Sequence, residues 1–143
     1  MCGPKPFQGM PKVLIVEDEP GTVERIRALL AELPVSHEMA VAEASTMHRA
    51  LELVKALPDL IVLDMYLAEN TTGTAFMVYY HRMVKNGTLP EIPVILMSSM
   101  SLPELENLQV TYPSIKELVQ KPLDYDKMFV AIARCLKLEV PEG

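Results

Sequence analysis

Four short apolar runs that end at polar residues constrain the fold of this sequence most strongly. The runs are rich in Val, Ile and Leu, and segments with helical spacing of apolar residues separate them. Such runs are typical of strands in a parallel sheet that is buried on both faces. They are Val13–Val16 before Glu17 and Asp18, Leu60–Leu63 before Asp64, Val94–Met97 before Ser98, and Leu118–Gln120 before Lys121.

The alternation of expected strands and helices predicts the architecture. We expect strands at 12–16, 38–42, 60–63, 94–97 and 115–119, and helices at 20–33, 45–57, 74–85, 102–110 and 124–138, with Ser45 and Asp124 as caps of the second and the last helix. Right-handed crossovers between parallel strands place helices on both faces of the sheet. The prediction is an α/β fold: a five-stranded doubly wound parallel sheet with the flavodoxin-like order 2-1-3-4-5 and five helices.

Length and composition indicate one domain. The 143 residues, half of them hydrophobic, suffice for a single core, which we place at 12–138 between a flexible leader at 1–11 and a tail at 139–143. No apolar stretch approaches the ~18 residues of a membrane span, and no cysteine–histidine cluster occurs. We therefore expect a soluble, cytoplasmic protein without membrane contact. The net charge of −6 argues against direct nucleic-acid binding.

The polar residues after the strands are expected to gather in one place. The carboxyl ends of parallel strands meet at the ligand-binding edge of such sheets, and the first and third strands are neighbours in the predicted order. Glu17, Asp18 and Asp64 should therefore lie close together, and their charges require a counter-ion. A hard cation with oxygen ligands suits this set, so we expect Mg²⁺, with Mn²⁺ as a substitute.

Phosphoryl chemistry fits this set of groups. Asp64, at the tip of the central strand, can act as a carboxylate nucleophile toward phosphorus. The charge of a transferred phosphoryl group lies on its equatorial oxygens, which Mg²⁺, the Lys121 ammonium and the Ser98 hydroxyl could each contact. Each residue alone also has a plainer interpretation, as a solvated turn, a strand end, a helix cap or a loop pair. Their coincidence at four strand ends favours the functional interpretation.

With these motifs the sequence resembles the receiver domains of two-component response regulators. The resemblance covers roughly residues 12–137 and rests on Val-Glu-Asp-Glu at 16–19, Leu-Asp-Met at 63–65, Ile-Leu-Met-Ser-Ser at 95–99 and Lys-Pro at 121–122. It implies that Asp64 is the phosphoacceptor, Ser98 the switch hydroxyl and Lys121 the partner of the phosphoryl group. It also implies a cis peptide between Lys121 and Pro122.

The resemblance further implies the metal ligands and the partners. Asp18 and Asp64 would ligate Mg²⁺ directly, Glu17 through water, and Tyr66 through its backbone carbonyl. A histidine kinase or phosphotransfer protein would donate the phosphoryl group, and the domain would catalyse its own phosphorylation and dephosphorylation rather than act as an enzyme on a separate substrate. The output would be binding to a protein target, or self-dimerisation, through the surface near the fourth and fifth strands.

The sequence departs from the family pattern at three positions. Ala68 replaces a usual proline, Gly73 lies nine residues after Asp64 rather than eight, and Leu118 replaces a usual aromatic residue of the switch. Two alternatives stay open: a pseudo-receiver that binds partners without phosphorylation, and a haloacid-dehalogenase-type Mg²⁺ hydrolase, whose D-x-D motif would need aspartate in place of Tyr66. Because few residues follow 138, we expect a stand-alone receiver or one cut from a longer protein.

Overall fold

A computed structural model of the chain describes residues 11–34, 39–65 and 73–138. Most of the expected leader, and all of the tail at 139–143, lie outside these ranges. The elements in chain order are β1 (Lys12–Val16), α1 (Pro20–Ala31), β2 (Ala40–Ala44), α2 (Met47–Leu53) with a 3₁₀ turn η2 (Val54–Ala56), β3 (Leu60–Asp64), α3 (Gly73–Lys85), β4 (Val94–Ser98), α4 (Leu102–Thr111), β5 (Ile115–Gln120) and α5 (Tyr125–Cys135).

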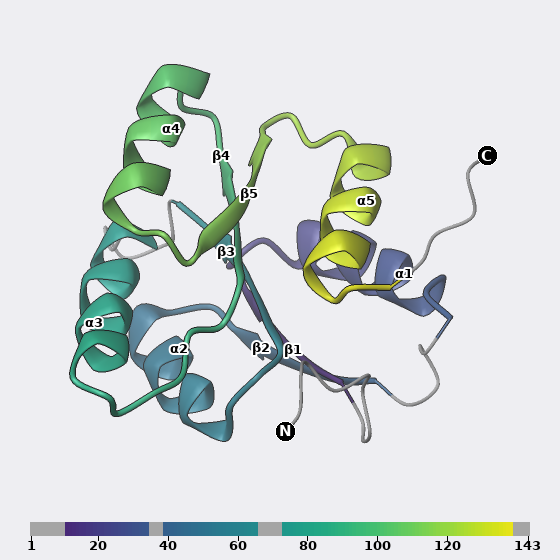
Figure 1. Ribbon diagram of the computed structural model, residues 1–143. Helices are drawn as coiled ribbons and strands as arrows, with labels where there is room; N and C mark the ends of the chain where they lie inside the picture. Colours follow the sequence, from purple (N-terminus) through teal and green to yellow (C-terminus); the bar gives the residue numbers. More distant parts are fainter. Residues whose placement is uncertain (1–10, 35–38, 66–72, 139–143) are drawn as a thin grey trace.

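The strands form one parallel sheet in the order β2-β1-β3-β4-β5, which confirms the predicted order. In Figure 1, α1 and α5 lie on one side of the sheet, and α2, α3 and α4 lie on the other. The described part of the chain therefore contains the five helices of the predicted doubly wound fold. Because both faces are covered, β3 and β4 at the centre are buried along their whole length.

Alternate residues of each strand build two separate apolar layers. On one face of the sheet, Leu63 and Leu96 pack with Phe76 of α3 and Leu105 of α4. On the other face, Val62 and Ile95 pack with residues of α1 and α5 such as Ile26 and Ile132. This period of two explains why the central strands read as continuous apolar runs, because each successive side chain faces a different helical layer.

Some element boundaries differ from the predictions. β2 lies at 40–44 rather than 38–42, and its register is set by pairing with β1, where Lys12 is opposite Ala40. Thr46 rather than Ser45 caps α2, because its side chain accepts a hydrogen bond from the Arg49 N–H. Helix α5 ends at Cys135, short of the expected 138. The predicted Asp124 cap of α5 is confirmed.

A buried tyrosine, Tyr80, hydrogen-bonds the loop that follows α3. Tyr80 is fully buried, and its hydroxyl accepts a hydrogen bond from the Ile92 N–H and lies 3.1 Å from the Ile92 carbonyl oxygen. The adjacent Tyr79 is 47% exposed. Tyr80 therefore connects α3 to the residues that lead into β4.

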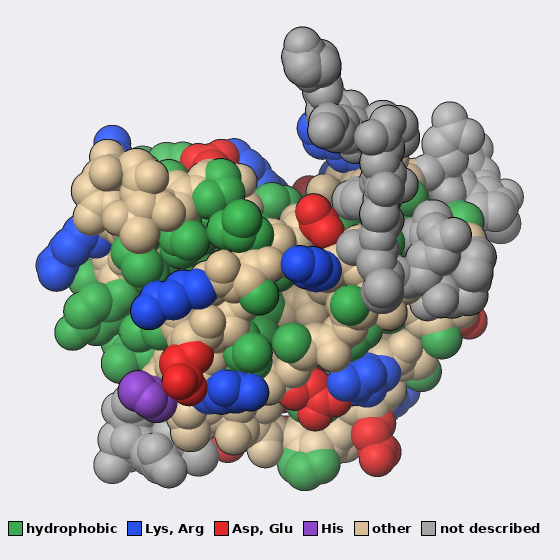
Figure 2. Space-filling model, turned by 90° about the horizontal axis from the view of Figure 1, so that it is seen from below, with side chains coloured by type: hydrophobic (Ala, Val, Ile, Leu, Met, Phe, Trp, Pro, Cys, Tyr) green, Lys and Arg blue, Asp and Glu red, His purple; other side chains and the backbone are tan. Residues whose placement is uncertain are grey.

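One face of the molecule carries basic and acidic side chains interspersed among hydrophobic ones, as Figure 2 shows, rather than a continuous basic patch. In the ranges that the structure describes, no helix has the length and apolar character needed to cross a membrane.

Candidate functional site: a carboxylate cluster at the strand ends

The polar residues predicted from the sequence stand at one edge of the sheet. Asp64 and Ser98 are the last residues of β3 and β4, and both are buried. Glu17 and Asp18 follow β1 directly, and Lys121 follows β5. Since β1 and β4 flank β3, the parallel register brings the ends of these strands beside Asp64.

Three carboxylates converge at this edge. One oxygen each of Glu17, Asp18 and Asp64 lies within 4.8 Å of the others. Glu17 is only 3% exposed and Asp64 only 2%, whereas Asp18 is open to solvent. The cluster therefore has two buried members and one at its mouth.

The two carboxylate oxygens of Glu17 have different surroundings. Its Oε2 accepts hydrogen bonds from the backbone N–H groups of Asp18 and Glu19, at 3.1 and 3.3 Å. Its Oε1 is buried and has no hydrogen-bond partner among the described residues. Burial, and then the neighbouring Asp64 carboxylate, raise the pKa of Glu17 from 4.5 to about 8, against the opposing effect of Lys121.

Lys121 supplies the positive charge of the site. Its Nζ lies 3.0 Å from Asp64 Oδ1 and 3.8 Å from Glu17 Oε1. Burial alone lowers the pKa of the Lys121 ammonium, but the Asp64 and Glu17 carboxylates outweigh burial and hold it above its usual value. The peptide between Lys121 and Pro122 is cis, as the family resemblance predicted.

Ser98 is connected to both the following loop and β5. Its side chain is fully buried, and Oγ accepts a hydrogen bond from the Met100 N–H at 3.0 Å. Its carbonyl oxygen accepts one from the Lys121 N–H at 2.8 Å. The second bond fixes the backbone of Lys121 against the end of β4.

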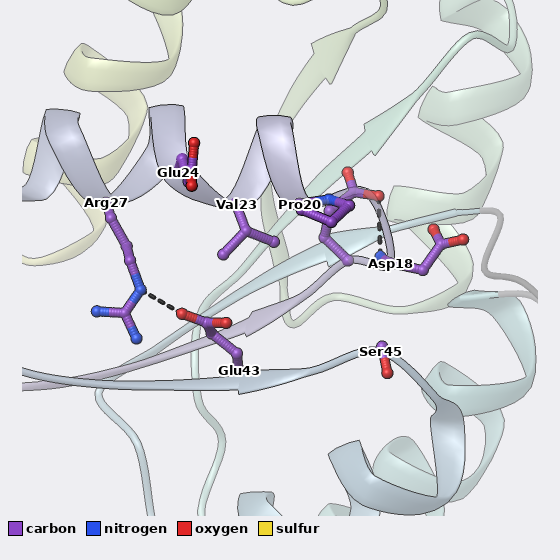
Figure 3. Close-up of a pocket in the computed structure, with 8 residues that line it drawn as sticks. Asp18, Pro20, Val23, Glu24, Arg27, Glu43 and Ser45 are labelled. Atoms are coloured by element: carbon purple, nitrogen blue, oxygen red, sulfur yellow. Dashed lines mark hydrogen bonds and ion pairs between the residues drawn. The ribbon is translucent and has the colours of Figure 1, made fainter.

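A pocket of about 530 Å³ opens beside Asp18, between α1 and the strands β1 and β2. Its walls carry four carboxylates and one guanidinium, and Figure 3 shows Arg27 of α1 paired with Glu43 of β2. Asp18 lies at the end of the pocket away from this pair in the same view. The solvent-facing side of the cluster is therefore predominantly negative.

The three carboxylates fit a hard divalent cation. Carboxylate oxygens are the ligands that Mg²⁺ prefers, and Mg²⁺ commonly takes one or two of them and keeps several waters. The buried Oε1 of Glu17, which has no hydrogen-bond partner in the described part of the chain, also fits an acceptor for such a bound water. Glu17, Asp18 and Asp64 are thus the residues that could hold the metal.

Most of the predicted site residues lie together in the structure. Glu17, Asp18, Asp64 and Lys121 meet at one edge, with Ser98 at the end of the adjoining strand. Tyr66, predicted as a carbonyl ligand, lies outside the described residues, as does Ala68. The sequence analysis did not single out Gln120, whose side-chain amide donates a hydrogen bond to the Met100 carbonyl beside the site. The sequence feature that could have drawn attention to Gln120 is its position directly before Lys121.

Comparison with known proteins agrees with this geometry. The sequence matches the response regulator receiver domain family over residues 13–133. The chain belongs to this family. Receiver domains are signalling domains, so the match places the chain in two-component signalling. No curated protein matches the sequence.

Solved receiver domains share the fold. The signal receiver domain of an HD domain-containing protein from Pseudomonas fluorescens Pf-5 superposes with a TM-score of 0.72 at 19% identity, over 95% of this chain and 93% of that one. A CheY-like receiver domain protein from Methanospirillum hungatei gives 0.72 at 17% identity, over 90% and 95%. The chemotaxis protein CheY4 of Vibrio cholerae gives 0.70 at 20% identity, over 89% and 99%.

Proposed function

We propose that this chain is a phosphoacceptor receiver domain that takes a phosphoryl group onto Asp64 and thereby changes its affinity for a protein partner. The observation that carries the proposal is the buried Asp64 carboxylate, held 3.0 Å from the Lys121 ammonium within a cluster of two further carboxylates. The proposed domain spans residues 12–138 and acts in the cytoplasm.

The proposed step is the attack of an Asp64 oxygen on the phosphorus of a phosphohistidine in a histidine kinase or phosphotransfer protein. The new phosphorus–oxygen bond forms as the phosphorus–nitrogen bond of the donor breaks, and the electron pair of that bond returns to the imidazole. Hydrolysis by water later restores the carboxylate and releases phosphate. Because catalysis of such transfers is mostly positioning and electrostatics, few groups are needed.

The residues beside Asp64 have complementary roles in this proposal. The Lys121 ammonium, already 3.0 Å from Asp64 Oδ1, neutralises charge on one phosphoryl oxygen. The Ser98 hydroxyl donates to another oxygen from the end of β4. Glu17, Asp18, Asp64 and the Tyr66 carbonyl would hold Mg²⁺, which supplies positive charge to the phosphoryl oxygens when bound.

The proposed output is a change in the surface near β4 and β5. Ser98 and Lys121 belong to the ends of these strands, so their contacts with a phosphoryl group would act directly on the loop after β4 and on β5. A protein target, or a second copy of this chain, would then bind with altered affinity. A ligand shifts such an equilibrium only by its differential affinity for the two states.

Phosphorylation by acetyl phosphate tests the proposal. The wild-type chain with Mg²⁺ is expected to gain one phosphoryl group by intact mass, and Asp64→Asn is expected to gain none, because the amide keeps the shape but lacks the nucleophile. Asp126→Asn is the matched control, since Asp126 is an exposed carboxylate on α5.

Three outcomes distinguish the possibilities. Loss of labelling in Asp64→Asn alone supports the proposal. Labelling of Asp64→Asn near the wild-type level would assign the phosphoacceptor elsewhere. A wild-type chain that binds Mg²⁺ but takes no label would instead indicate the pseudo-receiver, an interaction module without phosphotransfer.

A further inference from the structure

Two hydrogen bonds connect the end of β5 to the end of β4 and the loop that follows it. The Lys121 N–H donates to the Ser98 carbonyl at 2.8 Å, and the Gln120 side-chain Nε2 donates to the Met100 carbonyl at 3.0 Å. Ser98 and Gln120 are also partners in the β4–β5 register. The residue that bonds Met100 is therefore the chain neighbour of the lysine that contacts Asp64.

Three contacts hold Met100 in place. Its N–H donates to Ser98 Oγ, and its carbonyl accepts from Gln120. Its side chain packs against the apolar layer beneath α3 and α4. The bond to Ser98 orients the hydroxyl toward this loop, so the position of Met100 and the orientation of Ser98 depend on each other.

The Gln120 amide is the exposed component of this arrangement. Gln120 is the last residue of β5 and faces solvent, two positions after Leu118. The side chain of Leu118 has no hydrogen-bonding group. On this part of β5, the side chain that hydrogen-bonds the loop after β4 is therefore that of Gln120.

We infer that Gln120 is a positioning residue that holds Met100, and through it Ser98, in the arrangement of the unphosphorylated domain. This inference rests on the proposed phosphorylation of Asp64. A phosphoryl group on Asp64 attracts the Ser98 hydroxyl, and any displacement of Met100 with it stretches the bond from Gln120. The bond from Gln120 therefore opposes the rearrangement of Ser98 and Met100 on phosphorylation, and removal of this bond should make that rearrangement easier.

The size of the effect follows from the bond that is lost. A net hydrogen bond contributes of order 1 kcal/mol, which corresponds to roughly a two- to tenfold change in an equilibrium constant. Gln120→Met keeps the length of the side chain and removes the donor without adding charge. In this variant the phosphoryl mimic beryllofluoride, with Mg²⁺, should reach half-saturation at a roughly two- to tenfold lower concentration.

The chain provides a matched control at the other end of β5. Gln109 of α4 also donates its Nε2 to a backbone carbonyl, that of Ile115, at 3.0 Å. Gln109→Met therefore removes the same kind of bond far along the strand from Lys121. Amide NMR can follow both measurements, the beryllofluoride titration and hydrogen exchange of the Met100 N–H in the metal-free protein.

The expected result is a lower beryllofluoride midpoint and faster Met100 N–H exchange in Gln120→Met, with both quantities unchanged in Gln109→Met. A Gln120→Met protein with the wild-type midpoint and wild-type Met100 exchange would overturn the inference, as would equal shifts in Gln109→Met. If the wild-type chain does not respond to beryllofluoride, the proposed function fails instead. The Met100 exchange rates still decide whether Gln120 positions the loop.

Discussion

The ammonium of Lys121 lies 3.0 Å from Oδ1 of Asp64, although β4 lies between β5, which precedes Lys121, and β3, which ends at Asp64. The same ammonium lies 3.8 Å from Glu17 Oε1, beyond Asp64 in the sheet order. One cation thus faces two buried carboxylates, and a third carboxylate, Asp18, stands at the mouth of the site. The excess of carboxylates over ammonium groups is the basis of the first prediction, and the burial of Glu17 beside Asp64 is the basis of the second.

Metal binding should depend more on Asp18 than on Glu17. The Lys121 ammonium cannot balance the Asp18 and Asp64 carboxylates together with an incoming phosphoryl dianion, so phosphorylation is expected to require Mg²⁺ or Mn²⁺ and to stop in excess EDTA. Asp18→Asn should weaken Mg²⁺ binding on the order of tenfold or more, and Glu17→Gln should weaken it less. Isothermal titration measures both affinities.

The control for the metal prediction is Glu24→Gln, which removes an exposed carboxylate from the wall of the adjoining pocket. It should leave Mg²⁺ affinity unchanged. Undiminished phosphorylation in excess EDTA would contradict the requirement for metal.

The stability of the metal-free protein should fall as pH rises. Folding raises the pKa of Glu17 from 4.5 to about 8, so between these values the folded state binds more protons than the unfolded state. The free energy of unfolding then decreases with increasing pH through this window. Glu17→Gln should be more stable than wild type at pH 8, by about 1 kcal/mol or more, and the difference should shrink toward pH 5.

Urea unfolding in EDTA at several pH values checks this expectation. Glu24→Gln, which lacks an exposed carboxylate, should follow the wild-type pH profile. Excess Mg²⁺ should reduce the contribution of Glu17, since a bound cation favours the charged carboxylate. A wild-type and a Glu17→Gln protein with parallel profiles from pH 5 to pH 8 would show that Glu17 is ionised throughout.

The switch should depend on Ser98 more than on Leu118. Ser98→Ala removes the hydroxyl that would contact the phosphoryl group, so beryllofluoride should no longer change the affinity for a target or for a second copy. Leu118 is only half-buried and has no polar group, and Leu118→Ala should alter the response by less than ~1 kcal/mol. Dimerisation or target binding with and without beryllofluoride measures both. A response lost in Leu118→Ala and kept in Ser98→Ala would reverse these roles.

Tyr80 should contribute to stability through its hydroxyl. Tyr80→Phe keeps the ring but leaves the buried Ile92 N–H without its acceptor, which should lower the free energy of unfolding by about 1–3 kcal/mol. Tyr79→Phe, at the exposed neighbouring position, should stay within about 0.5 kcal/mol of wild type. Equal urea midpoints for the two variants would contradict this role of Tyr80.

The central strands and the site were predictable from the sequence for a common reason. A strand buried on both faces must be apolar throughout, so its end is visible where Asp64 or Ser98 interrupts the run. Because parallel strands end at the same edge, the location of the site followed from those interruptions. β2 was less visible, since this edge strand contains alanines and Glu43 and is only partly buried.

Other features depend on contacts that the sequence does not show. The buried Glu17 Oε1 and the resulting rise in its pKa depend on how closely β1 and β3 place their ends. The bond from Gln120 to Met100 joins side chain to backbone across two elements, and neither residue type predicts it. Whether Ser45 or Thr46 caps α2 depends on the backbone conformation of the preceding turn.

The residues of the site are dispersed along the chain, so the site is complete only when the strands that carry them have paired. Its acidic members come from β1 and β3, but its ammonium arrives only with β5, more than fifty residues after Asp64. A chain in which β5 has not paired with β4 would have the carboxylates without Lys121. The site is therefore incomplete whenever β5 is not paired with β4, even if β1 and β3 are in place.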